Sequence, residues 1–181
     1  MEKINYFNKK FQFIGSGNFG EVFEGRIISN NNSDKRNGET IRVAIKTLKN
    51  MDDDEDSIEF FKEAIAVSKL KHENIIQFLG VCEESNFMIF ELMEGPELKK
   101  YLKSVRNTEY TISDLVQLCY DVVKGCAYLE KMQCVHRDLA ARNCMLTSID
   151  PIHRKVILNS DRSGTEHFLK APISGRRRIF F

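Results

Sequence analysis

The nine residues from His136 to Cys144 constrain this chain more than any other part of its sequence. They place an aspartate, Asp138, five positions before an asparagine, Asn143, in a short polar stretch that follows a long amphipathic segment. A carboxylate can receive the proton of an attacking hydroxyl, and an amide oxygen can ligate a magnesium ion. Phosphoryl transfer from a metal-bound nucleotide needs both groups. The segment therefore predicts a catalytic loop for phosphoryl transfer.

A glycine-rich turn near the N-terminus is the second informative feature. Gly15, Gly17 and Gly20 lie within residues 11–26, whose apolar pattern predicts a strand, a turn and a strand. Glycines in such a turn let backbone N–H groups approach phosphate oxygens without obstruction by side chains. The same spacing opens dinucleotide-binding folds, where a helix follows, but residues 21–25 read here as a strand. A phosphate-binding loop is therefore favoured, and a glycine hairpin without a ligand stays open as the alternative.

A lysine and a glutamate on the next two predicted elements form a candidate pair. Residues 41–48 alternate as a strand does, with Lys46 on the face opposite Val43. A helix is expected over 57–70, and Glu63 lies on its otherwise apolar face. Because a glutamate in apolar surroundings needs a partner, Lys46 is the obvious candidate. A lysine held in this way can neutralise nucleotide phosphates, although any single strand lysine can also be an ordinary surface residue.

The middle of the chain predicts two further strands, around 75–82 and 87–92. A Gly-Pro pair at 95–96 then marks a linker where one lobe ends and a helical lobe begins. A short helix is expected over 98–105 and a short strand over 155–158. The order of the elements therefore predicts two lobes.

A long helix begins with the capping-box pattern of Thr111 and Asp114. Its apolar residues recur at helical spacing and form one stripe: Leu115, Leu118, Cys119, Val122, Cys126 and Leu129. Such a stripe requires a partner surface. The short remainder of the chain offers little to cover it, so we expect much of the stripe to stay exposed.

The composition excludes several classes of protein. The 27 lysines and arginines nearly cancel the 26 aspartates and glutamates, so the charge does not indicate a nucleic-acid binder. The five cysteines are odd in number and include no CxxC pair, which favours free thiols in a reducing compartment over disulfides or a zinc site. No signal peptide and no membrane span are expected, because the start carries no leader pattern and the apolar runs are short.

The ordered set of motifs resembles the catalytic domain of receptor-type protein tyrosine kinases. The loop His136-Arg-Asp-Leu-Ala-Ala-Arg-Asn143 is similar to their catalytic loop. The segments Gly80-Val-Cys82, Glu91-Leu-Met-Glu-Gly95 and Lys124-Gly-Cys-Ala-Tyr-Leu129 are most similar to the Ros/Sevenless branch, within the group that resembles the insulin receptor. The resemblance extends over residues 11–146, about three quarters of the chain.

The resemblance implies an α+β, protein-kinase-like bilobal fold. Residues 1–93 would form an N-lobe with a five-stranded antiparallel sheet and one helix, and residues 94–158 a hinge and an incomplete helical C-lobe. Residues 159–181 would be a divergent, disordered tail. The resemblance also implies ATP and Mg²⁺ as cofactors and a protein tyrosine as the acceptor. No nucleic-acid partner is expected. The expected location is the cytoplasm, on the cytoplasmic side of the plasma membrane if the chain is part of a receptor.

The same resemblance assigns roles to individual residues. Asp138 would be the catalytic base, and Arg142 would balance the charge of the transferred phosphate. Lys46, fixed by Glu63, would hold the nucleotide phosphates, and Asn143 would ligate the metal. The nucleotide-binding positions implied are Ile14, Gly15, Gly17, Gly20, Val22, Ala44, Lys46, Glu91, Met93 and Met145.

The sequence departs from the family after Leu158. Where the family has Asp-Phe-Gly, an ungapped comparison gives Ser160-Asp161-Arg162, and one inserted residue would let Asp161 serve as the second metal ligand. No activation segment and no Ala-Pro-Glu motif follow within the 181 residues. We therefore expect a truncated kinase. The alternatives are a catalytically inactive pseudokinase that binds a nucleotide or a partner, and a gene-model fragment that does not fold stably by itself.

Overall fold

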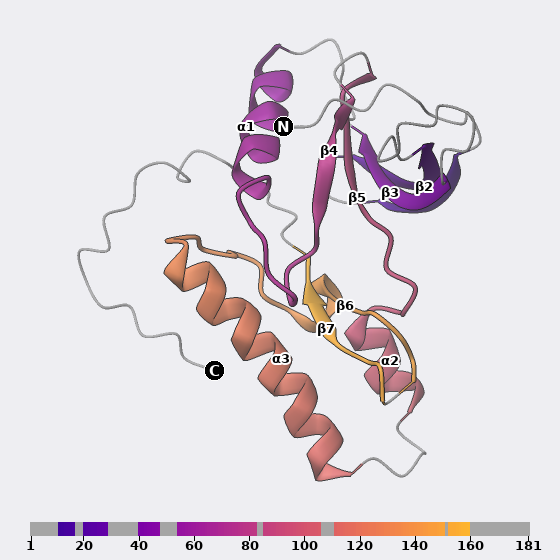
Figure 1. Cartoon of the computed structure of the whole chain (residues 1–181), viewed down its shortest axis with the longest axis vertical. Helices are drawn as coiled ribbons and strands as arrows, with labels where there is room; N and C mark the ends of the chain where they lie inside the picture. The colour runs from indigo at the N-terminus through magenta and orange to yellow at the C-terminus, as the bar shows by residue number, and fades with distance from the viewer. Residues whose placement is uncertain are drawn as a thin grey trace, which may run out of the picture.

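The structure is a computed structural model that describes residues 11–16, 20–28, 40–47, 54–82, 85–105, 111–150 and 152–159. Figure 1 shows two parts: a sheet flanked by one helix, and below it two helices with a small two-stranded sheet. Of the predicted tail, only Asn159 belongs to the described residues. Among those residues, no helix is long and apolar enough to cross a membrane.

The first part is a five-stranded antiparallel sheet, as predicted. Its spatial order is β1-β2-β3-β5-β4. The strands are β1 (Gln12–Ser16), β2 (Glu21–Ile28), β3 (Thr40–Thr47), β4 (Phe78–Cys82) and β5 (Phe87–Glu91). The strand predicted to begin near residue 75 starts at Phe78, because Ile75 leaves this sheet and forms an isolated parallel bridge with Leu158.

Helix α1 (Asp54–Val67) covers one face of the sheet through Phe60, Ala64 and Val67. The helix was predicted over 57–70, so it begins and ends earlier than expected. It begins at Asp54, three residues before the predicted start. After its end, the Ser68 hydroxyl donates to the Ile65 carbonyl, which is satisfied without a further helical turn.

The second part contains α2 (Leu98–Ser104), α3 (Ile112–Lys131), the 3₁₀ turn η2 (Ala141–Asn143), β6 (Cys144–Leu146) and β7 (Val156–Leu158). The predicted capping box is confirmed: the Thr111 side chain accepts from the Asp114 N–H, and the Asp114 carboxylate accepts from the Thr111 N–H. Helix α3 lies close against β7, since a Cβ on Gly125 would fall 2.7 Å from Leu158 Cδ1. A larger residue at position 125 would therefore push the helix and the strand apart.

The expectation that little covers the α3 stripe was only partly right. Leu118 and Leu129 are buried, and Val122 and Cys126 pack against the same core. Residues from β6, β7, α2 and the segment after α1 supply this core, which sequence periodicity alone did not reveal. Leu115 and Cys119 are exposed. They adjoin a second apolar face, whose members are Ile112, Val116, Tyr120 and Val123.

Candidate active site

Lys46 and Glu63 form the predicted ion pair between β3 and α1. Lys46 Nζ lies 3.0 Å from Glu63 Oε1 and 3.3 Å from Oε2. Both residues are buried, with exposed fractions of 5% and 4%. The sheet register places Lys46 between Val22 on one side and Met88 on the other. Strand and helix thus fix the direction of the ammonium group.

The catalytic-loop segment is held by its own side chains. Asp138 Oδ1 accepts from Arg142 Nη2 at 2.6 Å, and Asp138 Oδ2 accepts from Asn143 Nδ2 at 2.8 Å. Asn143 Nδ2 also donates to the Asp138 carbonyl at 2.8 Å. The chain reaches this arrangement through Arg137, which adopts a left-handed backbone conformation with φ of 66°. The three polar residues predicted from the motif are therefore in direct contact.

These contacts favour the ionised form of Asp138. The hydrogen bond from Asn143, followed by that from Arg142, lowers the pKa of Asp138 below its ordinary value. The carboxylate is therefore ionised at neutral pH and able to accept hydrogen bonds.

The orientation of Asn143 fits the chemistry of a magnesium ligand. Because its amide nitrogen donates to two oxygens of Asp138, the amide oxygen is the atom that faces elsewhere. Hard oxygen ligands of this kind suit Mg²⁺. In the described part of the chain, no group of three or more His, Cys, Asp or Glu residues could hold a metal ion. Asp161, the other predicted ligand, lies outside the described residues.

The predicted nucleotide-binding positions are spread over both parts of the structure. Gly15, Val22, Ala44, Glu91, Met93 and Met145 are half-buried, Gly20 is buried and Ile14 is exposed. Gly17 lies outside the described residues. A Cβ on Gly15 would meet no atom within 4 Å, so open space borders the backbone there. The Glu91 carboxylate accepts from the Gln77 N–H at 2.7 Å, which gives this side chain a structural contact as well.

Backbone hydrogen bonds tie the linker to β6. Leu146 donates from its N–H to the Pro96 carbonyl at 3.0 Å, and Glu97 forms an isolated bridge with Met145. A Cβ on Gly95 would lie 2.3 Å from the Leu146 carbonyl oxygen, so only glycine fits at this position. The strand that carries Met145 is thereby placed at the end of the linker that carries Met93.

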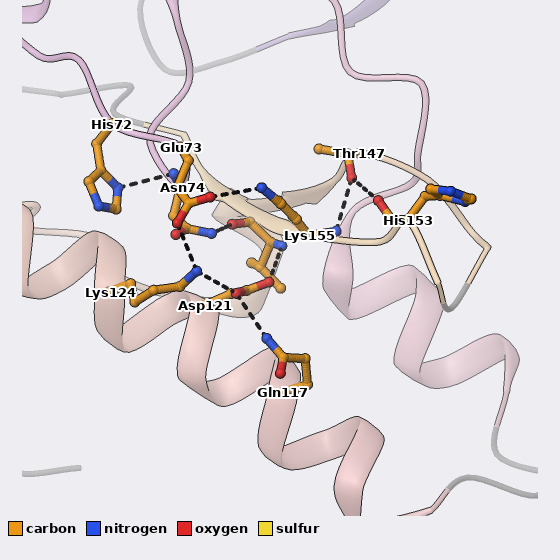
Figure 2. Close-up of polar contacts among 10 residues, drawn as sticks. His72, Glu73, Asn74, Gln117, Asp121, Lys124, Thr147, His153 and Lys155 are labelled. Carbon is orange, nitrogen blue, oxygen red and sulfur yellow. Dashed lines mark hydrogen bonds and ion pairs between the residues drawn. The ribbon is translucent and has the colours of Figure 1, made fainter.

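Sequence reasoning missed a polar cluster centred on Asp121 of α3 (Figure 2). The cluster also contains Asn74 and Glu73 from the segment after α1, Lys124 of α3 and Lys155, which precedes β7. One signal could have revealed it: Asp121 falls between Leu118 and Val122 on the apolar side of the helix. A charged residue at such a position needs buried partners.

Comparison with known proteins places this arrangement in a family. The profile of the protein tyrosine and serine/threonine kinase family matches residues 9–161. The chain belongs to this family, and the predicted kinase-like fold is confirmed.

The curated relatives agree with the predicted branch. The proto-oncogene tyrosine-protein kinase ROS of Rattus norvegicus is 46% identical over 155 residues, which cover 82% of this chain and 6% of that protein. Protein sevenless of Drosophila melanogaster is 39% identical over 159 residues, covering 81% of this chain and 6% of that protein. The leukocyte tyrosine kinase receptor of Mus musculus is 38% identical over 141 residues, which cover 74% of this chain and 15% of that protein. The chain thus spans a small part of these relatives, and its likeness is to tyrosine kinases of receptor type.

Proposed function

We propose that this chain carries the nucleotide-binding and catalytic-loop part of a receptor-type tyrosine kinase, and that the whole kinase transfers phosphate from ATP to protein tyrosines. Two contacts carry the proposal: the buried ion pair of Lys46 and Glu63, and the hydrogen bond between Asn143 and Asp138. Strand β3 and helix α1 hold the ion pair in place, and the loop motif holds Asp138 and Asn143 together. Each has the chemistry that its family role requires.

The residues would act as follows. Lys46, oriented by Glu63, holds the nucleotide phosphates, while the backbone of the glycine-rich turn lies against them. The adenine base is enclosed by Ile14, Val22, Ala44 and Met145. Residues 91–93 of the linker contact the edge of the base. Asp138 accepts the proton of the tyrosine hydroxyl, and Arg142 balances the charge of the moving phosphate. Bound through Asn143, Mg²⁺ would supply positive charge to the phosphate oxygens.

A second candidate function is nucleotide binding without transfer. It is favoured by the residues after Leu158, where Ser160-Asp161-Arg162 stands in place of Asp-Phe-Gly. The family aspartate at this point links the metal to the phosphates. A chain that lacks it keeps the lysine and the glycine turn but loses one of the two metal contacts.

We expect the folded chain to bind ATP weakly, with little help from magnesium. Lys46, the phosphate-binding group, and Glu63, which orients it, are in place. Asn143 alone, however, is a weak metal ligand. Titration of a fluorescent ATP analogue, with and without Mg²⁺, measures both affinities. A large magnesium-dependent tightening would show that Asp161 or another residue supplies the second ligand.

Lys46→Met is expected to lower both analogue affinity and stability. It removes the ammonium group that faces the buried Glu63 carboxylate, a change that typically costs about 3–5 kcal/mol. Lys62→Met, at an exposed position of α1 next to Glu63, is the matched control. It should change neither analogue affinity nor stability. Thermal unfolding and analogue titration of both variants provide the measurement, and equal behaviour of the two would contradict the assignment of Lys46.

A further inference from the structure

Two side chains hold the Val156 peptide of β7 from outside the strand pair. Val156 donates from its N–H to Asp121 Oδ2 at 3.0 Å, and its carbonyl accepts from Asn74 Nδ2 at 2.8 Å. Asp121 comes from α3 and Asn74 from the segment after α1, so three parts of the chain meet at the backbone of one residue, Val156 (Figure 2).

The burial of this contact explains why a side-chain acceptor is needed. Val156 and Asn74 are fully buried, and Asp121 is 2% exposed. A buried N–H group must find an acceptor inside the protein, because water cannot reach it. A buried carboxylate in turn needs donors and a positive charge. Besides Val156, Asp121 Oδ1 faces Gln117 Nε2 at 3.3 Å and Lys124 Nζ at 3.2 Å.

The position of β7 sets the position of the catalytic loop. Leu158 donates to the Asn74 carbonyl at 2.9 Å and pairs with Cys144 of β6. One residue further on, the Asn159 N–H donates to the carbonyl of Asn143 at 2.9 Å. A shift of β7 would therefore reach the predicted metal ligand Asn143, and through the β6 pairing it would also reach Met145.

We propose that Asp121 is a positioning residue of the nucleotide site: by holding the Val156 peptide, it keeps β7 in the register that anchors Asn143. The proposal rests on the proposed function, since it names a residue that supports that same site. Asp121 itself acts through β7 and the Asn143 carbonyl.

The ion pairs around Asp121 contribute less to the positioning of β7 than the hydrogen bond to Val156 does. Glu73 contacts Lys124 at 3.0 Å and Lys155 at 2.8 Å, and these two ammonium groups, Lys155 first, lower the pKa of Glu73 to about 2. Glu73 and Lys155 are both about half exposed, so solvent screens this outer pair. The hydrogen bond between Asp121 and Val156 is shielded from solvent, and it is this bond that positions β7.

The test compares four variants in the soluble fraction of the whole 181-residue chain. Asp121→Leu and Asp121→Ala remove the acceptor. Asp121→Asn keeps a carbonyl oxygen for Val156, and Lys124→Met removes only the ion pair. Two readouts are followed: hydrogen exchange of the Leu158 and Asn159 amides, and titration of a fluorescent ATP analogue. A fifth variant, Leu118→Ala, weakens the packing of the same helix at a buried position and serves as the control for general destabilisation.

Loss of the acceptor should speed exchange of the Leu158 and Asn159 amides by about tenfold. Because β7 also pairs with the base-enclosing Met145, analogue binding should weaken by a similar factor. Asp121→Asn and Lys124→Met should both keep analogue affinity close to that of the unmodified chain, although Lys124→Met should lower the melting temperature because it takes a cation from the buried Asp121 carboxylate. Leu118→Ala should lower the melting temperature but leave analogue affinity nearly unchanged.

Two results would overturn the proposal: unchanged amide exchange in both Asp121→Leu and Asp121→Ala, or an equal loss of affinity in Leu118→Ala at a matched melting temperature. Failure of the unmodified chain to bind the analogue would count against the proposed nucleotide site instead. In that case, the amide exchange still decides whether Asp121 holds β7.

Discussion

Transfer of phosphate to a generic tyrosine peptide is expected to be unmeasurable with this chain. Ser160-Asp161-Arg162 stands where the family has Asp-Phe-Gly, so a charge contact to the phosphates is missing. No activation segment follows within these 181 residues to position an acceptor tyrosine. Charge stabilisation and positioning each lower such a barrier by several kcal/mol, and their joint loss leaves a rate far below detection. Incorporation of labelled phosphate from ATP, at high enzyme concentration, is the measurement.

Two variants make this test specific. Detectable transfer that disappears in Asp138→Asn would contradict the expectation, because it would show a working active site. The combined substitution Ser160→Asp, Asp161→Phe and Arg162→Gly restores the family motif in the ungapped alignment. It should strengthen magnesium-dependent binding of the ATP analogue, although the acceptor platform is still missing. Asp161→Ala alone should have no effect on binding if this alignment is correct.

Self-association through α3 is the second large effect that we expect. Ile112, Val116, Tyr120 and Val123 are between 45% and 82% exposed and fall at helical spacing on one face. Each large apolar side chain left in water forgoes roughly 1.5–3 kcal/mol of burial. Several together rival the net stability of a whole domain, about 5–15 kcal/mol. The chain expressed alone should therefore aggregate or depend on chaperones, while residues 11–93 keep most of their local order.

A double substitution on this face tests whether it causes the self-association. Val116→Glu with Tyr120→Lys should increase the soluble, monomeric fraction, as measured by analytical ultracentrifugation. Ile58→Lys, at a 55% exposed position on α1, is the matched control and should have little effect. The idea fails if the unmodified chain is a monodisperse monomer with one cooperative melt and protected amides between Leu115 and Leu129.

Features encoded within a few neighbouring residues could be predicted from the sequence. The capping box of Thr111 and Asp114 and the contact between Asp138 and Asn143 each lie within five positions of the chain. The Lys46–Glu63 pair spans 17 positions, but it was predictable because a glutamate on an apolar helix face demands a cation.

Long-range packing could not be predicted in the same way. Periodicity showed that α3 has an apolar stripe but not which elements cover it, so the cover from β6 and β7 was missed. Asp121 and Val156 are 35 positions apart, and the partner is a backbone N–H that every residue except proline provides. Such a partner leaves no trace in the sequence. The register of β7 also depends on tertiary contacts, since a three-residue strand carries almost no pattern of its own.

The anchoring of the linker determines where the two parts of this structure can bend. Glu91 is fixed at the upper end, where its N–H donates to the Gln77 carbonyl at 3.0 Å. At the lower end, Gly95 fits tightly against Leu146, and Pro96 accepts a hydrogen bond from it. Any rotation at this linker must therefore be absorbed by Leu92, Met93 and Glu94. Met93, a predicted nucleotide-binding position, is thus one of the three residues whose backbone torsions would change if the two parts rotated.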